Sequence, residues 1–150
     1  MLKKLKVNFL GFFLFILSNT IFAENKRPVF KQIMCSINVN KKNPQELSLD
    51  IADNEQKRSY GLMNRKDMKR NSGMLFIWKD SRIRNFWMKN THFDLDLFFL
   101  NNDGKIIEIY KNAKAFDETK IISKEKVKYV LEMNAGEQNF RIGNKLRCNF

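Results

Sequence analysis

The chain has 150 residues and a formal net charge of +12. This length is enough for one domain with a real core and too short for two. The cations are spread along the chain, which argues against a nucleic-acid partner and leaves peripheral contact with an anionic envelope surface open. Two cysteines and one histidine are too few for a structural zinc site.

Residues 1–23 have the order of a secretory signal peptide. A basic start, MLKKLK, precedes the apolar run VNFLGFFLFIL, and the segment ends at the small residue Ala23. The apolar run is shorter than the roughly 20 residues that a membrane-spanning helix needs. We therefore expect export and cleavage after Ala23, giving a periplasmic or secreted protein with a net charge of +9, because the removed segment holds three lysines and no acid. An uncleaved N-terminal anchor is the alternative.

The mature chain begins with a predicted linker over 24–32, which is charged and contains a proline. Residues 33–150 are predicted to form one β-rich domain. Apolar residues alternate over 33–39 and again over 46–52, which predicts two strands.

A short helix is predicted to follow. Asp53 and Gln56 have the spacing of a capping box, in which side chains satisfy the free N–H groups at a helix start. A second short turn over 64–69, and one or two turns of helix over 135–143, are the other helical expectations.

The central part of the chain predicts further strands over 74–78, 84–90, 95–100 and 105–110, with a turn over 79–82. Asp103-Gly104 stands between the last two and is typical of a tight hairpin, because glycine accepts the positive φ that the turn requires. A loop over 111–125 and two last strands over 127–133 and 145–150 complete the pattern.

About seven or eight short strands with two short helices predict a mainly β fold, either a compact β-sandwich or a partly closed barrel. Cys35 lies on the first predicted strand and Cys148 on the last. Because chain termini often meet in compact domains, and exported proteins with an even cysteine count usually form disulfides, we predict that the two are bonded.

Six motifs follow one another in a fixed order along the chain. They are YGLMNR (60–65), GMLFIW (73–78), FWMKNT (86–91), LDLFFLNNDGKI (95–106), VLEMNAG (130–136) and RIGNKL (141–146). Over about residues 46–148 this combination resembles domain-of-unknown-function family 192. The resemblance implies a compact β-rich domain, often exported behind a signal peptide, and implies no particular reaction. Asp94 stands where the family usually has proline, so this turn is less rigid.

The segment 84–90 contains the main candidate for a binding site. If it is extended, Phe86 and Met88 enter the core while Trp87 and Lys89 share the opposite face. A tryptophan beside cations is a plausible cradle for a sugar ring or a small anion. The candidate ligand-binding residues are Arg65, Trp87, Lys89, Asn90 and Asp96.

These predicted site residues are expected to converge at the rim of the sheet. Lys89 and Asp96 are separated by one short turn and are expected to pair across it. Met74 and Phe76, on an apolar strand, are expected to be buried with Phe86 and Met88.

Catalytic signatures are absent from the sequence, so whether the protein is an enzyme stays open. There is no nucleophile elbow and no phosphate-binding glycine loop, and the sequence predicts no cofactor. The lone His92 lies in a predicted turn and is expected to be solvated. Asp94 and Asp96 would stand about 6.6 Å apart on an extended chain, which is compatible with a carboxylate pair.

Methionines suggest one further possibility. Met63, Met68, Met74 and Met88 lie close together in the sequence, with His92 nearby. Thioether and imidazole ligands select Cu(I), although methionine also fills gaps in apolar cores.

Taken together, these features favour a non-enzymatic exported module, expected to be a monomer, that binds a small ligand or a glycan. The alternatives are an envelope enzyme that acts on a small or glycan substrate, and a Cu(I)-binding protein.

Overall fold

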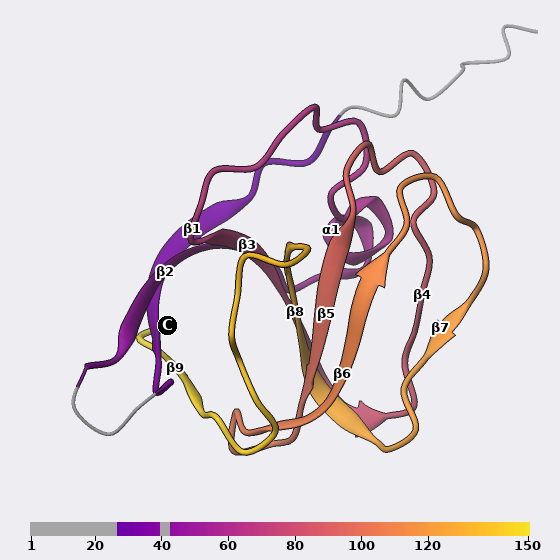
Figure 1. The fold of residues 1–150 in the computed structure, drawn as a ribbon. Helices are drawn as coiled ribbons and strands as arrows, with labels where there is room; N and C mark the ends of the chain where they lie inside the picture. The colour runs from indigo at the N-terminus through magenta and orange to yellow at the C-terminus, as the bar shows by residue number, and fades with distance from the viewer. Residues whose placement is uncertain (1–26, 40–42) are drawn as a thin grey trace, which may run out of the picture.

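A computed structural model describes residues 27–39 and 43–150, so the predicted signal peptide lies outside the described residues. In this part of the chain, nine strands and one short helix form a seven-stranded sheet and a two-stranded sheet beside it (Figure 1). The predicted mainly β fold is confirmed. None of the helices within the described ranges has the length and apolar character needed to cross a membrane.

The elements in chain order are β1 (Lys31–Ile37), β2 (Gln45–Ala52), α1 (Glu55–Tyr60), β3 (Ser72–Arg82), β4 (Asn85–Phe86), β5 (Leu95–Leu100), β6 (Ile106–Ala113), β7 (Ile121–Ile122), β8 (Val127–Asn134) and β9 (Leu146–Cys148).

The large sheet has the strand order β6-β5-β8-β3-β2-β1-β9 and curls until its two edges approach each other (Figure 1). Only β2 and β3 pair in parallel, because α1 and the connection after it return the chain to the same end. Near the other edge, the hairpin between β5 and β6 reaches β9: Leu146 N donates to Gly104 O at 2.9 Å, and Ile106 N donates to Asn144 O at 2.9 Å. Of the two architectures predicted, the partly closed barrel is therefore the one formed.

The disulfide closes the seam of this half-barrel. Cys35 on β1 and Cys148 on β9 are direct antiparallel partners, their Cα atoms are 4.3 Å apart, and their sulfurs are bonded. The sequence prediction that the first and last strands are neighbours is confirmed.

Alternation along the strands divides the apolar residues into two cores on opposite faces of the large sheet. The first core lies inside the curl, where β9 covers the sheet, and includes Phe98 and Leu100 of β5. The second core lies under the layer formed by α1, β4 and β7, and includes Leu97 and Phe99 of the same strand. Because both faces are covered, every residue of β5 is buried.

Several element predictions are wrong in detail. The expected strand over 84–90 is reduced to β4, because only Asn85 and Phe86 pair with β7, and the chain turns at Asn90, which has a left-handed φ of 52°. β3 continues through the predicted turn over 79–82, β7 lies in the predicted loop over 111–125, and β1 begins inside the predicted linker.

The helical predictions are also corrected. The cap of α1 is Asn54, whose side chain accepts a hydrogen bond from Lys57 N at 2.9 Å, while Asp53 instead pairs with Lys57 Nζ. Within the described residues α1 is the only helix: the segment 65–69 is irregular, and 135–143 has short turns only at its two ends.

Candidate functional site

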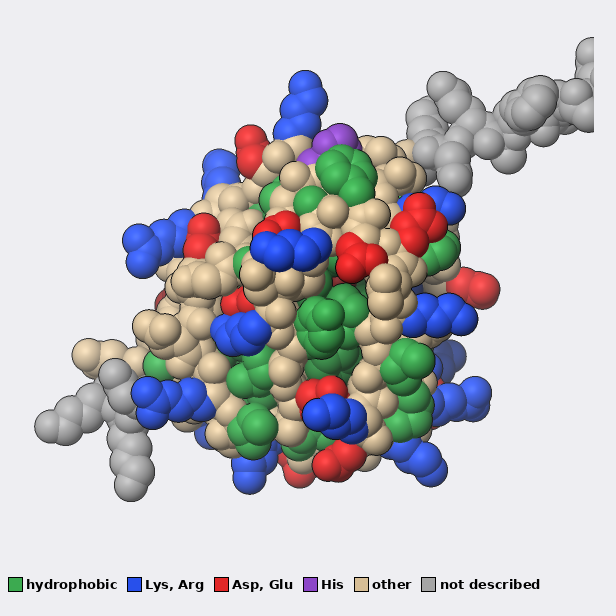
Figure 2. Space-filling view, turned by 45° about the vertical axis from the view of Figure 1, so that its right-hand side comes forward, with side chains coloured by type: hydrophobic (Ala, Val, Ile, Leu, Met, Phe, Trp, Pro, Cys, Tyr) green, Lys and Arg blue, Asp and Glu red, His purple; other side chains and the backbone are tan. Residues whose placement is uncertain are grey.

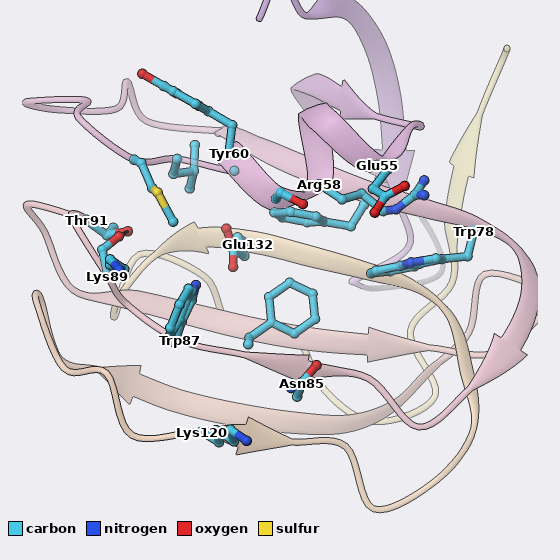
Figure 3. A pocket seen from close by; sticks show the side chains of 16 residues that line it. Glu55, Arg58, Tyr60, Trp78, Asn85, Trp87, Lys89, Thr91, Lys120 and Glu132 are labelled. Carbon is cyan, nitrogen blue, oxygen red and sulfur yellow. Dashed lines mark hydrogen bonds between the residues drawn. The ribbon is translucent and has the colours of Figure 1, made fainter. Parts of the chain in front are cut away.

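A cavity of about 680 Å³ opens between α1 and the sheet, on the side of the second core (Figure 3). One wall comes from α1 and the turn after it, and the other from β3 and the segment that begins with β4. A single residue of β8, Glu132, reaches the cavity from the sheet. Its volume lies within the range of pockets that hold small organic ligands.

Glu132 is the only buried one among the charged residues that line the cavity. It lies between Met74 of β3 and Leu97 of β5 in the sheet register, is only 4% exposed, and stands at the centre of the side chains drawn in Figure 3. Within the described part of the chain, no hydrogen-bond donor or cation contacts its carboxyl group. Burial raises the pKa of Glu132 to about 8, and the nearby charge of Arg65 offsets this only in part. At neutral pH the carboxyl therefore largely keeps its proton.

Aromatic side chains form the walls. Phe86 of β4 packs edge-on against Phe76 and Trp78 of β3, with ring centroids 5.1 and 6.2 Å apart. Trp78 lies between two guanidinium groups, those of Arg58 at 5.4 Å and Arg84 at 4.4 Å. These contacts fix the ring positions, because each aromatic ring is held by neighbours on more than one element.

Trp87 forms the outer part of the wall. It is 45% exposed, and the Lys89 ammonium lies 5.0 Å from its ring centroid. Both residues line the cavity, so the predicted pairing of an exposed indole with a cation is present.

The end of α1 and the turn after it depend on local sequence. Gly61 has a φ of 52°, and a Cβ atom there would lie 3.4 Å from the Phe76 ring. Glycine thus permits the chain to turn directly over the aromatic wall. The turn is then tied to the segment after β4, because Asn64 N donates to Asn90 O at 2.8 Å.

The predicted site residues do not all meet. Arg65 is placed beside the cavity rather than in its lining: its Nη2 forms an ion pair with Asp50 Oδ2 at 2.7 Å, and its guanidinium lies over the Phe30 ring. Asn90 is exposed in the turn and contributes its carbonyl to Asn64.

The predicted pair between Lys89 and Asp96 is wrong. Asp96 lies on the face of the first core, because it alternates with the β5 residues that face α1. Its carboxylate pairs with Lys111 Nζ at 2.8 Å and accepts hydrogen bonds from Asn112 N and Gly136 N. Asp96 therefore staples β5 to β6 and to the turn after β8.

The two predicted turn acids do not form a carboxylate pair. Asp94 forms its own ion pair with Lys114 Nζ at 2.8 Å, and this hydrogen bond, with that from Ala115 N, lowers the pKa of Asp94. Neither Asp94 nor Asp96 lines the cavity.

The residues considered for copper have different surroundings. Met74 and Met88 are buried in the second core, with Met68 packed against it, whereas Met63 lines the cavity. His92 is exposed and its ring lies 4.9 Å from that of Phe116. Copper binding stays an untested alternative.

Sequence reasoning missed most of the residues that line this site, among them Arg58, Tyr60, Trp78 and Glu132. A signal for Glu132 was present, because it is an acid inside the apolar run of β8, a strand that is covered on both faces. No comparable signal marks Arg58 or Tyr60, which belong to a polar helix with no buried residue.

Residues 36–148 match the model of the family DUF192, described as Uncharacterized ACR. A proposed transcription regulator from Sinorhizobium meliloti 1021 has a similar structure, with a TM-score of 0.78 and 32% identity, covering 82% of this chain and 98% of that one. A protein of unknown function from Novosphingobium aromaticivorans DSM 12444 has a TM-score of 0.72 at 22% identity, covering 81% and 94%, and so shares the fold. A search of curated proteins finds no match.

Proposed function

The chain belongs to the uncharacterised family DUF192, and from this membership and the geometry of the cavity we propose that it is a non-enzymatic module that binds a small ligand, such as one sugar ring of a glycan. The observation that carries the proposal is the buried, unpartnered carboxyl of Glu132 at the floor of an aromatic cavity. Ligand sites commonly combine apolar and aromatic walls with a few convergent polar groups.

The arrangement suits a ring with polar substituents. The indole of Trp87 offers a flat apolar surface at the mouth, and the Glu132 carboxyl offers hydrogen-bonding capacity below it. Lys89, Lys120 and Thr91 add donors around the opening. A bound hydroxyl would satisfy a polar group that the chain leaves without a partner.

We place this function outside the cytoplasm. The signal-like order of residues 1–23 and the disulfide between Cys35 and Cys148 support that location, because disulfides persist in oxidising compartments. Mass spectrometry of the mature protein should find a chain that starts at Glu24, and a protein that retains Met1 would instead be anchored.

Ligand binding can be tested by following backbone amide shifts in NMR spectra during titration with a panel of neutral and charged monosaccharides. We expect shifts to concentrate on α1 and residues 85–91, and Trp87→Ala to abolish them. Tyr110→Ala is the matched control, because Tyr110 is 43% exposed and lies outside the cavity lining. A panel that leaves every cavity amide unshifted would contradict the proposal.

A second candidate is an enzyme that uses Glu132 as a general acid. The raised pKa favours it, because a carboxyl that keeps its proton at neutral pH can donate it to a leaving group. Glu55 on α1 is the other acid in the lining. Turnover of a chromogenic glycoside that disappears in Glu132→Gln would establish this activity.

DNA binding, which the description of the Sinorhizobium relative suggests, has less support. Lysine and arginine side chains are scattered among acids and neutral residues over the face shown in Figure 2. Arg65 and Arg84 are engaged in ion pairs with acids of this chain. Binding to a duplex requires cations gathered on one surface.

A further inference from the structure

The carboxyl of Glu132 lacks the counter-ion or hydrogen bonds that buried acids normally have. It is 4% exposed, and among the described residues nothing donates to it or pairs with it. Buried polar groups in folded proteins are almost always hydrogen-bonded, and buried charges are paired. Whatever satisfies this group in use therefore comes from outside the described chain.

Three of the cations in or beside the cavity, Arg58, Arg65 and Lys89, contact groups other than Glu132. Arg65 forms its ion pair with Asp50, and Arg58 Nη1 donates to Ile77 O at 2.9 Å. The Lys89 ammonium lies over the neighbouring indole. None of these three cations forms an ion pair with Glu132, so a ligand can supply the counter-cation.

We propose that the cavity recognises a protonated amino group on a ring or a short carbon skeleton, with Glu132 as its ionic partner and the aromatic walls around it. This inference rests on the proposed ligand-binding function and specifies its chemistry. Aromatic faces attract an ammonium through their negative quadrupole, and the attraction grows when the cation is desolvated. The carboxylate supplies the charge-assisted hydrogen bonds.

Binding of such a cation changes the protonation state of the Glu132 carboxyl. In the empty cavity burial raises the pKa of Glu132 to about 8, so the carboxyl is largely neutral at pH 7. An ammonium ligand favours the ionised form, and its binding should release close to one proton, or about 0.9 at pH 7. The charged groups that face the cavity or lie beside it are Glu55, Arg58, Arg65, Lys89 and Lys120.

Isothermal titration calorimetry with two matched pairs of probes tests the inference. The pairs are cyclohexanol with cyclohexylamine, and glucose with glucosamine. We expect each amine to bind at least about tenfold more tightly than its hydroxyl partner, the scale of a desolvated cation–π contact. Cyclohexylamine titrations in two buffers of different ionisation enthalpy should give a release near one proton.

Two variants test whether the amine preference depends on the Glu132 carboxyl. Glu132→Gln should remove both the amine preference and the proton release, and circular dichroism should show that it remains folded. Glu125→Gln is the control, since Glu125 is exposed and outside the cavity lining, and it should bind like the wild type.

Each outcome is decisive. Equal affinity within each pair, or an amine preference that survives in Glu132→Gln, overturns the amine inference and leaves the proposed ligand-binding function standing. Failure of all four probes to bind, with no shift of cavity amides for any sugar, overturns both.

Discussion

Two buried acids on neighbouring strands have opposite environments. Asp96 of β5 is 1% exposed on the face of the first core, and it is held by the Lys111 ammonium and two backbone N–H groups. Glu132 of β8 is equally hidden on the other face and has no partner among the described residues. A buried acid whose hydrogen-bonding capacity is used by the chain stabilises the fold. A buried acid without such partners, beside a cavity, is available to a ligand.

The same contrast distinguishes the two faces of the sheet. The first core is cross-linked by the disulfide between β1 and β9, and the second borders the cavity under α1 that Glu132 reaches. Stability is therefore expected to depend mainly on the first face and recognition on the second.

The largest effect is expected at the seam of the first core. The double substitution Cys35→Ser with Cys148→Ser removes a cross-link over 113 residues of sequence separation. The loop-entropy model gives a loss of about 4.7 kcal/mol in the free energy of unfolding. Chemical denaturation under oxidising conditions measures it, and ligand binding at low temperature should persist. Unchanged stability would mean that the disulfide does not constrain the unfolded chain.

The next effect concerns the pH dependence of stability. Because the folded pKa of Glu132, about 8, lies above its ordinary value of 4.5, the folded protein retains a proton that the unfolded chain loses. This contribution is full below pH 4.5 and is lost as the pH rises to 8, with a slope of at most about 1.4 kcal/mol per unit.

Comparison with Glu132→Gln isolates that term. In denaturant titrations from pH 5 to pH 8, the free energy of unfolding of the variant should rise relative to that of the wild type by up to about 4 kcal/mol. Glu125→Gln should show no such rise. Parallel curves for wild type and Glu132→Gln would show that Glu132 is ionised at neutral pH.

Asp96→Ala is expected to have a smaller but clear effect. The change leaves Asn112 N and Gly136 N without their acceptor, which should cost about 2–3 kcal/mol of unfolding free energy. Asp103→Ala, on the exposed hairpin turn, provides the comparison and should cost less than about 0.5 kcal/mol. Similar losses for both would remove the distinction between the structural and the available acid.

The smallest effect is expected for Lys89→Met at the rim of the cavity. Its cation–π contact with Trp87 is partly exposed, so unfolding free energy should fall by less than about 1 kcal/mol. Affinity for cyclohexylamine should rise, because a like charge is removed from the rim of the cavity, and calorimetry can measure it. A large loss of stability would mean that Lys89 has a structural role similar to that of Lys111.

The sequence alone determined the features that depend on local patterns or on a small number of choices. Alternating apolar residues located most strands, and Asp103-Gly104 located the hairpin, because these signals act over a few residues. The disulfide was predictable because the chain offers only one possible pair.

The partners of charged residues were decided by tertiary structure. Asp96 was expected to meet Lys89 across a turn, yet strand alternation places it on the opposite face, beside Lys111. The cavity likewise combines α1, β3 and β4 with Glu132 of β8, a strand that comes much later in the sequence. Whether an acid such as Glu132 is satisfied depends on which distant segments cover it, and that is fixed only when the sheet curls and α1 packs over one of its faces.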